Sequence, residues 1–193
     1  MRVIAGNARG VRLVAPAGLQ TRPTSDRVKE ALFSIIENRF MLADAVILDI
    51  CAGTGALGIE ALSRNAASCC FIEKERRAAE AIKKNLAVAK TIGQARILEM
   101  DALKALRLLA EEKVRFDLIF FDPPYSSPLY LPIVAVISDF SLLSDDGMLI
   151  VESDRRSLLP EQVGSLVKID RRVYGDSSVE IFNMTISNQG GEI

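Results

Sequence analysis

Three absences narrow what this chain of 193 residues can do. It contains no histidine, which removes the commonest zinc ligand and the usual base beside a nucleophilic serine or cysteine. No apolar run approaches the roughly 20 residues needed to cross a bilayer, and residues 1–6 lack the long apolar stretch of a secretory signal. We therefore expect a cytoplasmic protein with no metal site and no membrane contact.

Cysteine is also scarce. The three cysteines, Cys51, Cys69 and Cys70, are an odd number in strand-like apolar contexts, so we interpret them as small buried hydrophobes. With 49% hydrophobic and 25% charged residues, the composition is typical of a soluble globular protein. The length suits one domain with a sizeable core, and we expect a monomer.

The net charge is close to zero, at −1, but the charges are unevenly placed. Residues 1–30 hold six basic and two acidic residues, a net charge of +4, which leaves −5 for the remainder. A basic end on a slightly acidic body indicates a local contact with a polyanion, and the alternative is a solvated charged face. The candidate contacts are Arg9, Arg12, Arg22 and Arg27.

The N-terminal part of the chain predicts a hairpin and a helix. Short apolar runs at 2–5 and 11–15 flank a loop bounded by Gly6 and Gly10, which is a hairpin pattern. After a connector with two prolines, Thr24, Ser25 or Asp26 can cap a helix. The apolar stripe of this helix recurs at helical spacing and consists of Val28, Ala31, Leu32, Ile35 and Ile36.

From residue 45 onward, strand-length apolar runs alternate with helical stretches. The runs are 45–50, 69–73, 95–100, 116–121 and 148–152, and the helical stretches are about 56–64, 75–91, 102–112 and 129–139. This alternation favours an α/β fold with a parallel sheet covered on both faces. Two alternating runs, 166–174 and 179–186, then predict an antiparallel hairpin at the sheet edge.

The predicted architecture is thus a doubly wound, mostly parallel, seven-stranded Rossmann-like sheet with an antiparallel C-terminal hairpin and a small N-terminal hairpin-plus-helix extension. We divide the chain into a basic extension at 1–43, the α/β domain at 44–187 and a flexible tail at 188–193. No internal repeat, low-complexity segment or linker marks a second folding unit.

The motif Asp122-Pro123-Pro124-Tyr125 directly follows the apolar run 116–121. The prolines break the strand and offer carbonyls without N–H donors, which makes a stiff turn rich in acceptors. The amine of a nucleobase is a weak nucleophile, because its lone pair is delocalised into the ring. The Asp122 carboxylate and the Pro123 carbonyl can accept its two hydrogens, and Tyr125 can stack on the ring. The alternative is an ordinary turn with an N-capping aspartate.

A second group of residues suits a nucleoside-bearing cofactor. The loop after the first parallel strand, Asp49 to Gly58, brings backbone close to a ligand at a helix N-terminus through Gly53 and Gly55. Glu73 ends the next strand, where a carboxylate can hold both ribose hydroxyls. Asp101 ends the third strand, where it can accept a hydrogen bond from an adenine amine beside the Ala102 backbone. Each acid taken alone could instead be a helix cap.

Topology joins the two groups. In a doubly wound sheet the first and fourth parallel strands are neighbours at the switch point, where ligands bind. The loop at Gly53 and Gly55 is therefore expected to face Asp122. With no metal set and no histidine-activated nucleophile, direct displacement at an electrophilic group of the cofactor is the economical mechanism.

Together these residues resemble a known family, the class I S-adenosylmethionine-dependent methyltransferases that modify amines. The chain is most similar to the RsmD type, bacterial enzymes that methylate the N2 amine of one guanine in small-subunit (16S) ribosomal RNA. The resemblance covers nearly the whole chain. The segments that carry it are 2–6 with Arg9-Gly10, 22–33, 49–64 with Glu73 and Asp101, 122–125, and Tyr174-Gly175-Asp176.

The resemblance implies a role for each matching residue. The backbone of Gly53 and Gly55 would surround the methionine moiety, Glu73 would hold the ribose, and Asp101 with Ala102 would read the adenine. Asp49 and Cys51 would complete the cofactor site, although Cys51 stands where relatives often have an aromatic residue. Asp122, Pro123 and Tyr125 would form the catalytic turn, and Arg9, Arg12, Arg22 and Arg27 would hold phosphates of ribosomal RNA or of the assembling small subunit.

Four other functions remain open from the sequence. A protein-glutamine methyltransferase usually has asparagine in place of Asp122, and a DNA amino-methyltransferase normally adds a target-recognition region for which 193 residues leave little room. An NAD-dependent oxidoreductase would use Gly53-x-Gly55-x-x-Gly58 but would leave the 122–125 motif unexplained. A non-catalytic ribosome-assembly factor would bind RNA alone and would leave the cofactor acids without a role.

Overall fold

The computed structural model describes residues 1–15, 26–124 and 127–185, apart from the side chain of Arg27. Several predicted residues lie outside this part of the chain, namely Arg22, the caps Thr24 and Ser25, Tyr125, and the tail. Within it, no helix is both long and apolar enough to span a membrane.

Five helices and eight strands make up the described fold. In chain order they are α1 (Asp26–Glu37), β1 (Val46–Ile50), α2 (Ala56–Ser63), β2 (Ser68–Ile72), α3 (Arg76–Val88), β3 (Ala95–Leu98), α4 (Ala102–Glu111), β4 (Phe116–Phe121), α5 (Tyr130–Asp139), β5 (Leu143–Asp154), β6 (Gln162–Val163), β7 (Leu166–Tyr174) and β8 (Ser177–Met184), with a short 3₁₀ turn at Ile92–Gln94. Helix α4 shows why such a segment becomes a helix at its place in the fold. Asp101 caps its start by accepting the N–H groups of Leu103 and Lys104. Its buried side consists of Ala105, Leu106 and Leu109.

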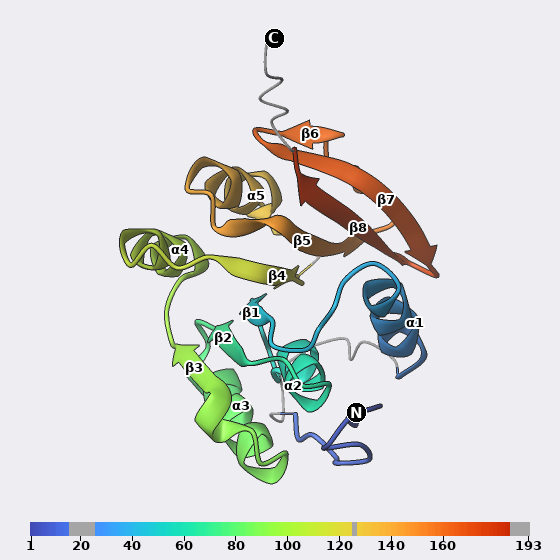
Figure 1. Cartoon of the computed structure of the whole chain (residues 1–193), viewed down its shortest axis with the longest axis vertical. Helices are drawn as coiled ribbons and strands as arrows, with labels where there is room; N and C mark the ends of the chain where they lie inside the picture. Colours follow the sequence, from blue (N-terminus) through green and yellow to red (C-terminus); the bar gives the residue numbers. More distant parts are fainter. Residues whose placement is uncertain (16–25, 125–126, 186–193) are drawn as a thin grey trace, which may run out of the picture.

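The eight strands form one sheet in the order β3-β2-β1-β4-β5-β8-β7-β6 (Figure 1). The first five are parallel, and β8, β7 and β6 are antiparallel. Strands β1 and β4 lie side by side although two strands and three helices separate them in the sequence. This places the switch point of the sheet between β1 and β4 and confirms the predicted doubly wound order.

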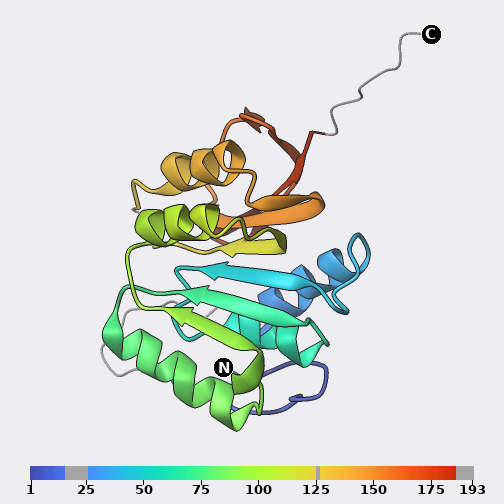
Figure 2. The same ribbon diagram turned by 60° about the vertical axis from the view of Figure 1, so that its left-hand side comes forward.

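Helices cover both faces of the sheet (Figure 2). One core layer joins α1, α2 and α3 to the sheet and includes Phe33, Ile59, Ile82 and Phe120. The other layer joins α4 and α5 to the opposite face and includes Leu106, Ile133 and Phe121. Because the central strands are buried on both faces, they are apolar nearly throughout, and a charged residue within one of them needs a specific reason.

The structure differs from the prediction in two places. The sheet has an eighth strand, the two-residue β6, and β5 begins at Leu143, five residues earlier than predicted. The predicted N-terminal hairpin is present: Arg2 and Arg12 form an antiparallel bridge, and the N–H groups of Val3 and Leu13 donate to the carbonyls of Val11 and Met1. The same segment also bonds to α2, where Glu60 accepts the N–H groups of Ile4 and Ala5.

Candidate active site

The candidate site lies where β1, β4 and β5 end at the carboxyl edge of the sheet. Ile50, the last residue of β1, is level with Phe121 of β4, and Phe121 is level with Val151 of β5. The N–H of Asp122 donates to the carbonyl of Ile50 over 3.4 Å, so the chain leaves β4 directly beside the loop that follows β1. The predicted meeting of the glycine loop with the Asp122 turn is therefore confirmed at the level of the backbone.

The loop after β1 has an unusual backbone. Cys51, Gly53 and Gly55 all have positive φ angles, of 61°, 57° and 74°, which non-glycine residues adopt at some energetic cost. Gly58 serves a different purpose, because a Cβ there would lie 2.4 Å from the ring of Phe71. Gly58 thus lets α2 pack directly on β2, while Gly53 and Gly55 shape the loop.

Asp49 is the charged exception within β1. Its carboxylate is buried and accepts the N–H of Gly58 over 2.9 Å, which ties the strand to the first turn of α2. Burial raises the pKa of Asp49 to about 7; the Gly58 N–H partly opposes this, and the negative charge of Glu73 adds to it. Asp49 therefore holds the loop in shape and titrates near neutral pH.

Glu73 follows β2 and reaches the same loop. One carboxylate oxygen accepts the N–H of Gly53 over 2.8 Å, and the other accepts the N–H of Glu75 over 2.9 Å. Each carboxylate oxygen has a second lone pair for a further donor. The buried Glu73 side chain is thus fixed in orientation next to the glycine loop.

Asp101 stands at the exposed start of α4. One of its oxygens accepts the N–H groups of Leu103 and Lys104 over 3.0 and 3.2 Å, so the aspartate is a helix cap. The same geometry fixes the side chain at the end of β3, and the neighbouring Ala102 is buried. The helix-cap interpretation is correct for Asp101, and its predicted contact with an adenine stays a prediction.

Asp122 lies at the centre of a group of acids. Burial raises its pKa well above the ordinary value, and the negative charges of Glu152 and Asp49 raise it further. Pro123 is buried, Pro124 is exposed, and the carbonyl of Pro124 accepts the N–H of Ser127 over 2.8 Å to close the turn.

Sequence reasoning missed Glu152. Phe120 of β4 and Ile150 of β5 are register partners, and both belong to the same core layer. Asp122 and Glu152 each follow two residues after one of these partners. The two-residue period of strands sets both acids on that side of the sheet. The sequence did contain one signal for Glu152, which is its position at the end of a predicted strand. Glu152 is the last residue of the predicted run 148–152, and Glu73 likewise stands directly after β2.

The surroundings of Cys51 disfavour the thiolate, which is the nucleophilic form of a cysteine. Burial raises its pKa to about 12, and the charges of Glu73, Asp122 and Asp49 contribute in the same direction. All three cysteines are free; Cys69 and Cys70 are buried as predicted, whereas Cys51 is only half-buried and the prediction is wrong for it. In the described part of the chain no group of histidine, cysteine or acidic side chains is arranged to hold a metal ion.

The predicted arginines are spread along the N-terminal segment. Arg9 and Arg12 are exposed, but the loop that carries Arg9 packs against the far end of α2, where Asn7 bonds to Ser63 and Asn65. Arg9 is therefore about one helix length, roughly 12 Å, from the glycine loop. Arg22 and the Arg27 side chain lie outside the described residues.

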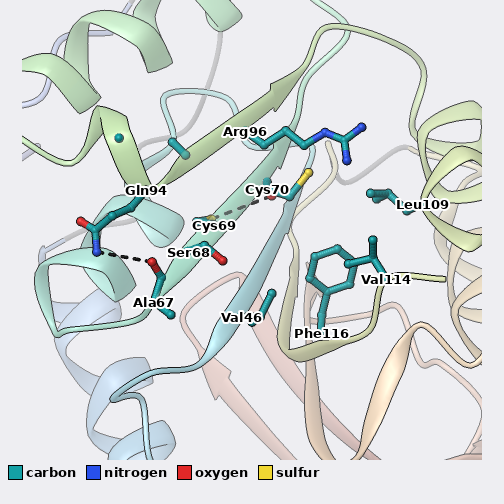
Figure 3. Close-up of a pocket in the computed structure, with 12 residues that line it drawn as sticks. Val46, Ala67, Ser68, Cys69, Cys70, Gln94, Arg96, Leu109, Val114 and Phe116 are labelled. Atoms are coloured by element: carbon teal, nitrogen blue, oxygen red, sulfur yellow. Dashed lines mark hydrogen bonds between the residues drawn. The ribbon is translucent and has the colours of Figure 1, made fainter. Parts of the chain in front are cut away.

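A hollow of about 370 Å³ lies at the opposite edge of the sheet (Figure 3). It is lined by residues that start the parallel strands, among them Val46, Ser68, Ala95 and Phe116. Arg96 borders it and is paired with Glu112 through two contacts of 2.5 and 2.8 Å. The hollow lies away from the acids of the carboxyl edge, so it takes no part in the candidate site.

Comparison with known proteins places this geometry in context. The family model described as "Conserved hypothetical protein 95" matches residues 1–183. YlbH of Bacillus subtilis (strain 168), provisionally named an rRNA methyltransferase, is 39% identical over 182 residues, which cover 94% of this chain and 98% of that protein. Ribosomal RNA small subunit methyltransferase D of Escherichia coli (strain K12) is 38% identical over 160 residues, 83% of this chain and 78% of that protein.

The same relationship holds in three dimensions. The solved structure of the Escherichia coli protein yhhF, provisionally described as a methyltransferase, superposes with a TM-score of 0.83 at 35% identity. The superposition covers 95% of this chain and 97% of the other. The similarity thus includes the N-terminal segment as well as the sheet.

Proposed function

The chain belongs to the RsmD-type family of ribosomal RNA small subunit methyltransferases and has the class I methyltransferase fold, and from this premise we propose its reaction. It transfers a methyl group from S-adenosylmethionine to the N2 amine of a guanine in 16S ribosomal RNA. The observation that carries the proposal is the adjacency of the positive-φ glycine loop and Asp122 at the switch point. Family membership also favours a methyltransferase over a dinucleotide-dependent oxidoreductase.

The amine is oriented by acceptors at the end of β4. The Asp122 carboxylate and the Pro123 carbonyl accept its two hydrogens, so that the nitrogen lone pair points outward. Tyr125 completes this turn by stacking on the base. A stacked guanine cannot enter such a site, so we expect the base to swing out of its RNA context. Holding the nitrogen within roughly 3–3.5 Å of its target supplies much of the rate.

The charge of the site fits the proposed cofactor. S-adenosylmethionine carries a positive sulfonium, and the carboxylates of Asp49, Glu73, Asp122 and Glu152 gather at this edge. The proposed contacts are the Gly53 and Gly55 backbone with the methionine moiety, Glu73 with the ribose, and Asp101 and Ala102 with the adenine, with Cys51 beside them. When bound, the cofactor supplies an electrophilic methyl group.

The raised pKa of Asp122 sets a condition on this role. An ionised carboxylate accepts hydrogen bonds at both oxygens, whereas a protonated carboxyl carries a proton that one oxygen donates. A cation bound beside Asp122 stabilises the ionised form and so lowers the pKa of this carboxyl. We therefore propose that the binding of a positively charged cofactor prepares Asp122 to accept one hydrogen of the amine.

The basic N-terminal extension, residues 1–43, is proposed to contact RNA through Arg9, Arg12, Arg22 and Arg27, and residues 44–187 to carry the catalytic domain. An extended RNA or a ribosomal subunit is large enough to contact Arg9 and the catalytic turn at once, because Arg9 is only about one helix length, roughly 12 Å, from the glycine loop beside that turn.

Methyl transfer tests the proposal directly. Small subunits and free 16S RNA from a strain lacking this gene are incubated with the protein and labelled S-adenosylmethionine, and the modified nucleotide is mapped by mass spectrometry. We expect label on one guanine N2. Label in protein with none in either RNA sample would overturn the proposed substrate.

A further inference from the structure

Asn85, a residue of α3 with no exposed surface, joins two distant parts of the chain. Its side-chain carbonyl accepts the N–H of Val14 over 2.8 Å, and its amide donates to the carbonyls of Val14 and Thr54 over 3.0 and 2.9 Å. Both amide hydrogens and the oxygen are thus used in a buried place. Such a fully satisfied polar contact is directional, and it fixes how its partners lie.

The two partners belong to the proposed cofactor loop and to the N-terminal segment. Thr54 is buried between Gly53 and Gly55, whose φ angles are both positive. Val14 is the penultimate residue of the described N-terminal segment 1–15, which we call the arm. The arm touches the loop a second time at its other end, where the sulfur of Met1 lies 3.8 Å from the Thr54 hydroxyl.

The rest of the arm is anchored to helices rather than to the sheet, and it runs past α2 towards α3 (Figure 1). Glu60 of α2 is buried; it accepts the N–H groups of Ile4 and Ala5 and pairs with Lys29 of α1 over 3.1 Å. Ser63 accepts the N–H of Ala8 over 2.9 Å. Because α2 begins directly after the loop, the arm and the loop share one rigid support.

We infer that Asn85 is a positioning residue that couples the arm to the cofactor loop, so that a ligand that orders the loop also orders the arm. Loss of the Asn85 amide leaves the buried carbonyl of Thr54 and the partly buried carbonyl of Val14 without this donor, and the Val14 N–H without its acceptor, which loosens both partners. Coupling of this kind is reciprocal, and RNA bound at the arm then favours the loop conformation that holds the cofactor. The inference rests on the proposed function for the identity of the ligand.

Hydrogen exchange with S-adenosylhomocysteine as the ligand tests the coupling without any turnover. In the wild-type protein we expect the ligand to slow exchange in the loop and also at Leu13 and Val14, by roughly fivefold or more. In Asn85→Leu, which removes the donors but keeps a similar volume, the loop is still protected and the arm no longer responds.

Ser63→Ala is the matched control, because it removes an anchor of the arm at the end of α2 that is farther from the loop and that makes no direct contact with the loop. Exchange in the arm should be faster throughout in this variant, with the ligand-dependent slowing retained. Should Asn85→Leu fail to fold, Val14→Pro removes the hydrogen bond from the Val14 N–H to the Asn85 side chain from the exposed arm side and leaves the bond from Asn85 to Thr54 in place, and Leu13 then reports the exchange of the arm.

The outcomes distinguish the coupling through Asn85 from the proposed cofactor. If the ligand slows exchange in the loop of the wild-type protein but not in the arm, the coupling is overturned and the proposed cofactor stands. The coupling is likewise overturned if Asn85→Leu keeps the full response of the arm. Absence of protection in both loop and arm of the wild-type protein defeats the proposed cofactor, and the inference with it.

Discussion

At the carboxyl edge of the parallel strands three buried acids and the half-buried Asp122 lie together, whereas at the amino edge two exposed acids are each paired with an arginine. The three buried acids are Asp49, Glu73 and Glu152. Glu112 receives two hydrogen bonds from Arg96, and Asp145 pairs with Arg115 over 2.7 Å. The hydrogen bonds from Arg96 lower the pKa of Glu112. At the other edge, burial together with Glu152 and Asp49 raises the pKa of Asp122.

The two edges therefore differ in what their charges do for the fold. An arginine facing an exposed acid stabilises weakly and is screened by salt. Acids whose pKa is raised by burial and by one another oppose folding at neutral pH, and such groups are concentrated where a ligand or a reaction uses them. The contrast is an independent, physical reason to place the active site at the carboxyl edge.

Replacement of Asp122 by alanine should have the largest effect on function. The variant loses the acceptor that we propose to orient the amine, so we expect methyl transfer to fall by roughly 100-fold or more. Affinity for S-adenosylhomocysteine, measured by calorimetry, should stay close to that of the wild-type protein. Asp122→Asn keeps one carbonyl acceptor and should retain part of the rate.

Glu112→Ala is the control at the opposite edge, where removal of an acid should leave the rate of methyl transfer unchanged. A wild-type rate in Asp122→Ala, or an equal loss in both variants, would remove the distinction between the edges.

The second prediction concerns the pH dependence of stability. Asp49 ionises at about 7 in the folded protein, against 3.8 for a free side chain. Between these values the folded state keeps a proton that the unfolded state has released, so the stability due to this group falls as pH rises from about 4 to 7. The size of this fall is on the order of 4 kcal/mol.

Asp49→Asn still accepts the Gly58 N–H but cannot ionise, so this fall should be absent from its free energy of unfolding, measured in urea from pH 4 to 8. Glu112→Gln should show a difference of the opposite sign, because the lowered pKa of Glu112 contributes stability that is present above pH 4.5 and lost as pH falls. Parallel curves for Asp49→Asn and the wild-type protein would contradict the raised pKa.

The fold was predictable from the sequence where local pattern and tertiary pairing agree. The runs 116–121 and 166–174 coincide with β4 and β7 to the residue, because each is an uninterrupted strand pattern. Strand β5 begins earlier than its apolar run, since Leu143 pairs with Phe116 and a register shift follows before Leu118. The polar residues 144–147 carry no strand signal, and only the neighbouring strand defines this part of β5.

The site was predictable where it depends on the position of strand ends. Asp49, Glu73 and Asp122 follow from the rule that parallel strands end at one edge, and the structure gathers them there. The contacts that hold the arm were not predictable, because Glu60, Ser63 and Asn85 act on residues more than 50 positions away. A sequence pattern of period two or 3.6 records which side a residue faces and not which backbone group it will bind.

The smallest expected effect concerns the arm. It tests whether the basic extension binds the same RNA substrate that is proposed to react at the carboxyl edge. Arg9→Ala combined with Arg12→Ala should lower the slope of log affinity for 16S RNA against log salt by about 1 to 2, with the unfolding midpoint unchanged, because both side chains are exposed. Arg96→Ala with Arg115→Ala removes the same charge at the amino edge and should leave that slope unchanged. Equal slopes for the wild-type protein and the arm variant would show that Arg9 and Arg12 only form a solvated face. An equal fall of the slope in both variants would mean that RNA affinity depends on the total charge of the protein and not on a particular surface.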